Sequence, residues 1–394
     1  MSAAKWRKAM NSGAAAVGEW RGSPAGSPRP TEPDRVGRGE REAEPRHLPS
    51  ADDPYADHDA PRWLKFLWRH LAPRHWIAAA ALLVFPFAAS PFLTFQVGGQ
   101  SLALGLVALS LMFLSGYGGM VSLAQMTVAG AAGYTVAILG TSSTAISLGW
   151  PWPVTIVFAL AIAVAASVLV GWLSVRTEGI YTIMITLAMG VAFYYLALQN
   201  YSVFNGFQGF QKVYPPTVFG VDWRSPVPFY FLALAFALAG YLAVKYIARA
   251  PFGIALQGIR DNPRRMNSLG YNVTAHRVAA YAVAGLIAGV GGILFTWYNG
   301  LITPGSVGTS WLINILVIAV LGGMRHPLGP FLGALVFVLL QTFAIDVIDR
   351  ERFNLVIGGV FLAIVLFSPD GLLGLWASLR ARLQKQRAVS TSLR

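Results

Sequence analysis

The stretch SLALGLVALSLMFLSGYGGMVSLAQMTVAGAAGYTVAILG, residues 101–140, contains no Lys, Arg, Asp or Glu. It lies within a longer stretch, between Arg74 and Arg176, that is equally free of charged residues. A helix needs about 20 apolar residues to cross the hydrocarbon core, so this uncharged stretch alone can hold about four spans. Backbone groups in lipid must be hydrogen-bonded internally, which favours helices. The sequence therefore predicts an all-α integral membrane protein.

The overall composition agrees with this prediction. Of the 394 residues, 55% are hydrophobic and 12% are charged, whereas a soluble domain carries about 25% charged residues. The net charge of +13 is explained by membrane topology, which concentrates Lys and Arg on cytoplasmic loops. No nucleic-acid-binding motif accompanies the charge, so we expect no nucleic-acid partner. The absence of cysteine excludes disulfides and thiol chemistry.

Ten apolar segments predict about ten transmembrane helices, with Gly116, Gly118 and Gly119 interrupting one long apolar stretch. The segments are 76–95, 101–117, 123–140, 153–175, 180–199, 227–247, 278–298, 309–323, 328–345 and 353–368. If both termini are cytoplasmic, the basic loop 249–277 and the basic C-terminal tail both lie inside, as the positive-inside rule requires. Shifting the count by one span would place one of them outside.

The whole chain divides into four parts. Residues 1–60 are polar and of mixed charge, which is typical of disorder. Residues 61–75 combine apolar and basic side chains and predict a short amphipathic segment at the membrane interface. The transmembrane domain is expected at 76–370, and a basic cytoplasmic tail at 371–394.

Several classes of function are disfavoured by what the sequence lacks. No Asp or Glu lies within an expected span, although ion-driven carriers usually place ionisable groups at membrane depth. The chain has no phosphate-binding loop, so any ATP must be bound by a separate subunit. No His is spaced with a second His or a carboxylate as metal ligands are. No polar cluster has catalytic spacing, so we expect no metal, no cofactor and no enzymatic activity.

The basic loop has a local structure that can be read from its residues. Its sequence from Arg249 to Asn272 is RAPFGIALQGIRDNPRRMNSLGYN. Ala255, Leu256 and Ile259 fall at helical spacing and predict a first short helix. Asn262 suits an N-cap, Pro263 a first helical position and Gly270 a helix stop, which predicts a second helix. Its charge alone would equally fit a loop that lies on anionic lipid.

Several stretches, in the same order, resemble the permeases of branched-chain amino acid ABC importers of the LivM type. PFGIALQGIRDNPRRMNSLGYNVTAHRVAAYAVAGLIAGVGGILF, Pro251–Phe295, is similar to the coupling loop of that family and the span after it. Further stretches agree: GYGGMVSLAQMTVAGAAGYTVAIL (Gly116–Leu139), RTEGIYTIMITLAMG (Arg176–Gly190), VLGGMRHPLGPFLGA (Val320–Ala334) and SPDGLLGL (Ser368–Leu375). The resemblance covers roughly residues 76 to 378.

The resemblance implies a permease of the bacterial inner (plasma) membrane whose loop 249–277 contacts an ATPase. The implied partners are two ABC ATPase subunits, which bind the ATP, a second related permease and a periplasmic or extracellular substrate-binding protein. Membrane lipid surrounds the chain. The implied ATPase-coupling residues are Ala255, Leu256, Ile259, Arg260, Asp261, Asn262, Arg264, Arg265 and Gly270. Pro263 replaces an acidic residue common in the family, which alters the expected ATPase contact.

The Gly-rich segment and the span after Arg176 supply candidate residues for the translocation path. These candidates are Gly119, Ser122, Gln125, Thr127, Thr182 and Thr186. Small and hydroxyl residues are equally typical of close helix packing in membranes, so both interpretations stay open. The family's usual Gln and Gly-His are here Met120 and Ala124-Gln125. The resemblance implies an ATP-driven importer with branched-chain amino acids as the expected substrate; urea and short amides are the alternative, because related permeases share these motifs. An ATPase-independent carrier or channel is the alternative from another class.

Overall fold

A computed structural model describes the greater part of the expected transmembrane domain. The described residues are 82–140, 147–177, 179–217, 220–347, 358–359, 362 and 371–374. All of them belong to one compact unit, Leu71–Arg394. The predictions for residues 1–60 and 61–75, for most of the last span at 353–368, and for the tail beyond 374 lie outside the described residues.

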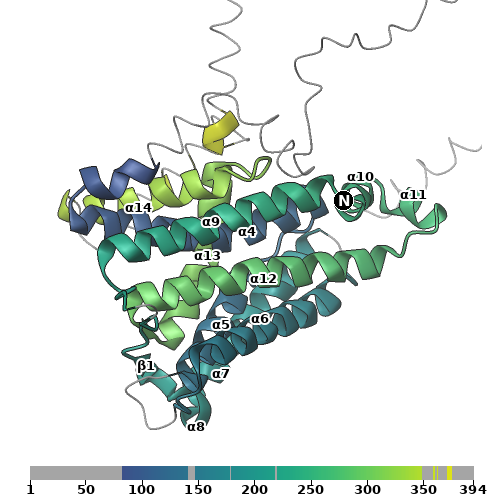
Figure 1. Ribbon diagram of the computed structural model, residues 1–394. Coiled ribbons are helices and arrows are strands. Elements are labelled where there is room, and N and C mark those ends of the chain that lie inside the picture. Colours follow the sequence, from purple (N-terminus) through teal and green to yellow (C-terminus); the bar gives the residue numbers. More distant parts are fainter. Residues whose placement is uncertain are drawn as a thin grey trace, which may run out of the picture. The chain divides into compact units, whose positions relative to one another are not determined.

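The described part of the chain is predominantly helical (Figure 1). Its longer helices are η1 (Leu93–Gly99), α4 (Gln100–Met112), η2 (Phe113–Tyr117), α5 (Gln125–Leu139), α6 (Trp152–Ser174), α7 (Ile180–Gln199), α9 (Pro226–Arg249), α10 (Pro251–Asp261), α11 (Pro263–Ser268), α12 (Val273–Asn299), α13 (Thr309–Gly322) and α14 (Gly329–Val347). The short elements are α8 (Tyr201–Phe204), η3 (Gly206–Gln208) and η4 (Pro304–Val307), with β1 (Phe210–Gln211) antiparallel to β2 (Leu301–Ile302).

Five of these helices are long and apolar enough to cross a membrane. They are Leu93–Tyr117, which joins η1, α4 and η2, and the helices α6, α7, α9 and α12. Three shorter apolar helices, α5, α13 and α14, occupy the positions of three further expected segments. The helical class is therefore confirmed, whereas the count of ten spans and the sides of the two termini stay predictions.

The first boundary differs from the expected one. Residues 82–88 are helical, the helix is interrupted at Ala89 and Ser90, and a new helix then runs without a break to Tyr117. Pro91 suits the start of a helix. The helix continues through Gly98. A Cβ at this position would lie 2.7 Å from the ring of Tyr230, so close packing requires a glycine here.

Successive long helices run in alternating directions between two ends. We call the end that carries α10 and α11, where α9 ends and α12 begins, the loop end, and the opposite one the far end (Figure 1). At the loop end, Arg260 of α10 reaches the carbonyl of Gly116, and Ser115 contacts Met324 after α13. The far end holds the paired strands β1 and β2. In the chain, β1 lies between α8 and α9, and β2 directly follows α12.

The charges are distributed unequally between these ends. Ten Lys and Arg residues lie in the described ranges. Eight of them lie at or near the loop end: Arg176, Lys245, Arg249, Arg260, Arg264, Arg265, Arg277 and Arg325. The two at the far end are Lys212 and Arg224. This asymmetry is the one that the positive-inside rule requires if the loop end faces the cytoplasm.

The helices differ in how deeply they lie in the bundle. In the most apolar part of Leu93–Tyr117, 94% of residues are buried, and in α12 67%, against 33% in α6, 22% in α7 and 28% in α9. The core is therefore built on α4 and α12. Where α6 packs on α12, small residues meet: a Cβ on Gly285 would lie 2.4 Å from the Ser167 side chain. Small residues of this kind permit close approach of membrane helices.

The absence of cysteine makes the sidedness directly testable. We expect a single Ser268→Cys at the loop end to react with a membrane-impermeant maleimide only after the membrane is opened. Ser202→Cys at the far end should react in intact cells, because both serines are exposed and lie at opposite ends. The measurement is gel-shift labelling of whole cells and of inverted vesicles. The reverse labelling pattern would show that the loop end faces the outside and would contradict the expected topology.

Candidate functional site

The helix break after Tyr117 is the first component of the candidate site. Helix η2 ends at Tyr117, residues 119–122 have no regular structure, and α5 begins at Gln125. Gly119 has φ +69°, a conformation that favours glycine. Ser122 and Ala124 are fully buried. The break expected in this Gly-rich segment is thus present; it begins at the exposed Gly119 and continues into buried residues.

Polar side chains form hydrogen bonds in and around this break. The backbone amide of Leu123 donates to Thr186 Oγ1 of α7 at 3.1 Å. Gln125 accepts from the Ser110 hydroxyl at 3.0 Å and donates to Ser122 Oγ at 3.5 Å. Three of the predicted path residues, Ser122, Gln125 and Thr186, are therefore brought together here. Their hydrogen bonds connect α4, the break and α7.

Thr186→Val should destabilise the protein by about 1 kcal/mol, because it leaves the buried Leu123 amide without its side-chain acceptor. Thr186→Ser keeps the hydroxyl and should retain most of the stability. Thermal unfolding of the purified protein in detergent measures both. Equal melting temperatures for the valine variant and the unmodified chain would show that this hydrogen bond contributes nothing.

The other predicted path residues lie apart from this group. Thr127 is buried beside α7, where a Cβ on Gly190 would lie 3.0 Å from its hydroxyl. Thr182 Oγ1 donates to the carbonyl of Thr177 at 2.9 Å, close to the start of α7. Gly119 lies at the surface against Arg260. Their role in a translocation path stays a prediction.

The second component is the pair α10 and α11, which have the predicted local structure. Ala255, Leu256 and Ile259 form the buried face of α10. The Asn262 side chain caps α11 by accepting from the Arg265 amide at 3.0 Å. Gly270, after α11, has φ +88°, a conformation that suits the expected helix stop. The loop is therefore a folded element.

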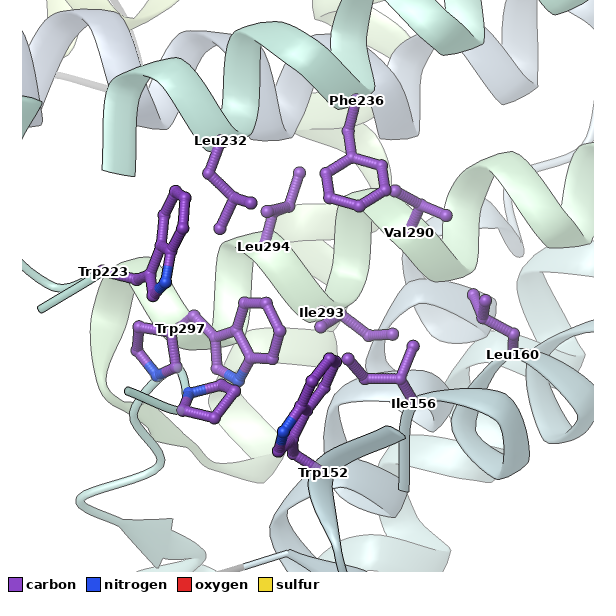
Figure 2. Close-up of a pocket in the computed structure, with 12 residues that line it drawn as sticks. Trp152, Ile156, Leu160, Trp223, Leu232, Phe236, Val290, Ile293, Leu294 and Trp297 are labelled. Carbon is purple, nitrogen blue, oxygen red and sulfur yellow. The ribbon is translucent and has the colours of Figure 1, made fainter. Parts of the chain in front are cut away.

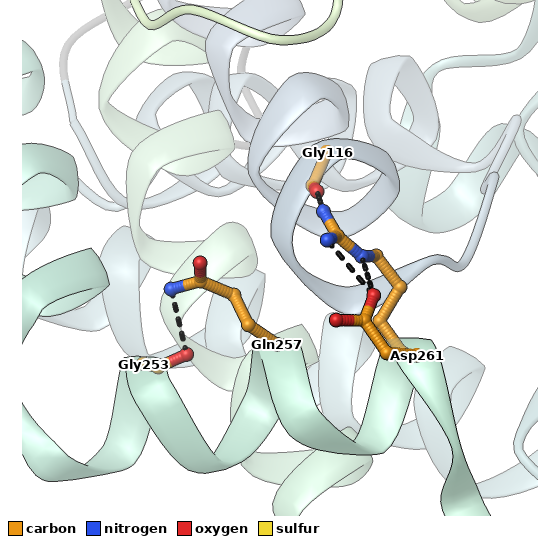
Figure 3. A network of polar contacts seen from close by, with 5 residues as sticks. Gly116, Gly253, Gln257 and Asp261 are labelled. Atoms are coloured by element: carbon orange, nitrogen blue, oxygen red, sulfur yellow. Dashed lines mark hydrogen bonds and ion pairs between the residues drawn. The ribbon is translucent and has the colours of Figure 1, made fainter.

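Helix α10 is attached to the end of η2 and to Gly119, the first residue of the break. Arg260 Nη1 donates to the backbone carbonyl of Gly116, and the same guanidinium is held by Asp261 Oδ1 at 2.9 Å (Figure 3). A Cβ on Gly119 would lie 2.6 Å from Cγ of Arg260, so the arginine stem lies across this glycine. Leu256 lies over Gly118, at 3.8 Å from the Cβ position. A movement of α10 must therefore act on the break.

The other end of α10 is attached to α9. Gln257 Nε2 donates to the carbonyls of Ala248 at 2.9 Å and Gly253 at 3.1 Å (Figure 3 shows the second). A Cβ on Gly253 would lie 2.0 Å from the carbonyl oxygen of Ile247, so the backbones of α9 and α10 are in contact. Helix α10 is thus fixed at both of its ends.

The outer face of the loop is exposed and mostly basic. Asp261, Arg264 and Arg265 are exposed. Leu269, directly after α11, has 67% of its surface exposed, and Ile254 and Tyr271 of the same loop are exposed as well, so the surface carries apolar side chains among the basic ones. Leu269 could not be singled out from the sequence, because a single leucine in a polar loop is as often buried. The carbonyl of Gly116 was also missed, since side-chain patterns do not indicate backbone acceptors.

A neighbouring turn at the loop end adds one titratable group. His326 lies between α13 and α14. Desolvation by burial, and then the charge of Lys245, lower the pKa of His326. It is therefore neutral over a wider pH range than an ordinary histidine. Among the described residues no three His, Asp or Glu side chains lie together as a metal site requires.

Apolar spanning helices, with a basic two-helix loop folded against them at one end, define a multi-pass helical membrane protein. The chain belongs to the family described as the permease component of branched-chain amino acid transport systems, whose model matches residues 93–365. It is accordingly a protein of the bacterial inner (plasma) membrane.

Individual relatives are similar at lower coverage. The LivM permease protein of the high-affinity branched-chain amino acid transport system of Salmonella typhimurium is 27% identical over 231 residues, 53% of this chain and 54% of the relative. The nucleoside ABC transporter permease protein NupC of Lactococcus lactis is 29% identical over 116 residues, 29% of this chain and 35% of the relative. The chain spans about half the length of the LivM relative. No solved structure matches.

Proposed function

We propose that this chain is the membrane-spanning permease subunit of an ATP-driven importer for branched-chain amino acids. The observation that carries the proposal is the attachment of α10, through Arg260, to Gly116 at the end of η2 and to Gly119 at the start of the break. A folded loop with an exposed basic face, fixed to the end of a buried helix and to the break after it, is suited to receiving a movement from a cytoplasmic partner. The family to which the chain belongs supports the same function.

The proposal assigns the loop end to the cytoplasm, with about ten spans and both termini inside. Two ATPase subunits bind ATP and contact α10 and α11. A second related permease completes the path, and a periplasmic or extracellular binding protein delivers the substrate at the far end. The chain itself carries out no covalent chemistry and needs no cofactor of its own.

The proposed mechanism follows from the contacts. When the ATPases close, they displace α10 and α11 together, because Gly258 packs on the Met266 side chain, with its Cβ position 2.9 Å from the sulfur. Arg260 passes this displacement to Gly116, and the hydrogen bond from Leu123 to Thr186 passes it to α7. The bundle then alternates between inward-facing and outward-facing states by rigid-body movement.

The substrate assignment is supported by the family and by the LivM relative. A nucleoside permease is similar at a comparable identity, so competition assays with leucine, a nucleoside and urea are needed to test the assignment.

Leu269→Asp should abolish most of the association with the ATPase subunits, because it replaces the most exposed large apolar side chain of α10, α11 and the residues after them by a charge. We expect the ATPase recovered with the affinity-purified permease to fall at least about tenfold. The matched control is Leu148→Asp, an equally drastic change at a leucine with 54% exposure at the far end. Equal recovery with both variants would contradict the assignment of this face.

A further inference from the structure

An apolar cavity of about 220 Å³ lies between α6, α9 and α12 at the far end (Figure 2). All twelve lining residues are apolar or aromatic, and none carries a charge. Such a lining offers nothing to the charged groups of an amino acid, so this cavity is separate from any site for the transported substrate. It is instead suited to a hydrocarbon ligand.

The lining changes in character along the helix axes. Three tryptophans lie towards the far end: Trp152 begins α6, Trp223 precedes α9, and Trp297 is near the end of α12. Tryptophan is enriched at membrane–water interfaces. From Trp152 the lining continues along α6 to Leu160, about 12 Å deeper at 1.5 Å per residue. The cavity therefore extends from the interface into the hydrocarbon region of one leaflet.

The helix beside the cavity has the surface of a lipid-facing helix. The buried face of α6 carries small residues such as Ala159, Ala163 and Gly171, which pack within the bundle. Its outer face is bulky, with Val157 at 65% and Phe158 at 48% exposure. Helix partners in membranes meet through small residues, so this outer face favours acyl chains over a second polypeptide.

A cationic residue is adjacent in the chain to the cavity lining. Arg224 directly follows the lining residue Trp223, and its guanidinium lies 3.7 Å from the ring centre of Tyr214, which precedes the lining residue Pro215. The Arg224 amide donates to Asp222 Oδ1 at 3.0 Å, which fixes the backbone there. A guanidinium that lies over an aromatic ring has its N–H groups in its own plane, from which they can bind a phosphate.

We propose that this cavity binds one acyl chain of a phospholipid of the far-end leaflet, with the lipid phosphate at Arg224. The acyl chain fills the space between α6 and α9 and packs on α12. The proposal rests on the cavity, the tryptophans and the arginine, and it is independent of the substrate and of the ATPase assignment.

The test is native mass spectrometry of the full-length protein purified from membranes containing phosphatidylglycerol. Ile156→Trp fills the cavity and should lower the retained phospholipid at least about fivefold. Val157→Trp, the neighbouring position outside the lining, is the matched control and should retain it. Arg224→Gln should lower retention of phosphatidylglycerol but not of diacylglycerol, which lacks the phosphate.

A second measurement needs no substitution that fills the cavity. The fluorescence of Trp297 is the difference between the emission of the unmodified protein and that of Trp297→Phe. Phospholipid brominated on its acyl chains should quench this component in the unmodified protein. Equal retention by Ile156→Trp and Val157→Trp, no quenching of Trp297, or a polypeptide bound in place of lipid would each overturn the proposal.

Discussion

Replacing Arg260 and Asp261 together by alanine should lower substrate uptake at least about tenfold while the ATPase subunits continue to hydrolyse ATP. The double variant removes the donor to the Gly116 carbonyl and the carboxylate that holds the guanidinium in place. A hydrogen bond to a charged group is worth about 1.5–3 kcal/mol, and a loss of about 1.4 kcal/mol is a factor of ten. Uptake and phosphate release measured on the same proteoliposomes separate the two activities.

Two controls make this result specific. Arg260→Lys keeps the charge and one donor, and it should restore part of the uptake. Lys212→Ala removes an exposed cation at the far end and should leave uptake and hydrolysis unchanged. Unchanged uptake in the Arg260 and Asp261 double variant would exclude α10 as the coupling element, whatever its contacts.

Gly292→Ala should be among the most destabilising single substitutions in the described part of the chain. A Cβ on Gly292 of α12 would lie 2.1 Å from the backbone carbonyl oxygen of Ala129 in α5. Backbone cannot move aside as a side chain can, so α5 and α12 must separate. We expect a loss of about 1–3 kcal/mol and a lower yield of folded protein, measured by thermal unfolding in detergent.

The matched control is Gly305→Ala in η4, where the nearest atom to the added Cβ is 3.5 Å away, an ordinary contact. This variant should unfold close to the temperature of the unmodified protein. If both alanine variants unfold at the same temperature, the close approach of α5 and α12 does not contribute to stability.

The local features of the site could be predicted from the sequence because they depend on local chemistry. Asn262 caps the helix that follows it, and Gly270 takes the left-handed conformation after that helix. Both are interactions within a few residues. The buried face of α10 was likewise readable from the spacing of Ala255, Leu256 and Ile259.

Features that depend on distant packing could not be read in the same way. The expected boundary between the segments 76–95 and 101–117 is absent: the helix continues through Gly98 and Gly99, against which the rings of Tyr230 and Phe229 pack. The acceptor for the Leu123 amide comes from Thr186, which lies 63 residues later in the chain. The apolar cavity also requires three helices and one loop to be placed together.

The central claim is that this chain forms a transport path driven by separate ATPase subunits. The most direct measurement is uptake of labelled leucine into proteoliposomes that contain the permease, its partner permease and the ATPases, with binding protein added at the far-end side. The account predicts uptake that requires ATP and both ATPase subunits and is lost with Leu269→Asp. Leucine uptake that proceeds at the same rate with the permease alone would contradict it and indicate a carrier or channel.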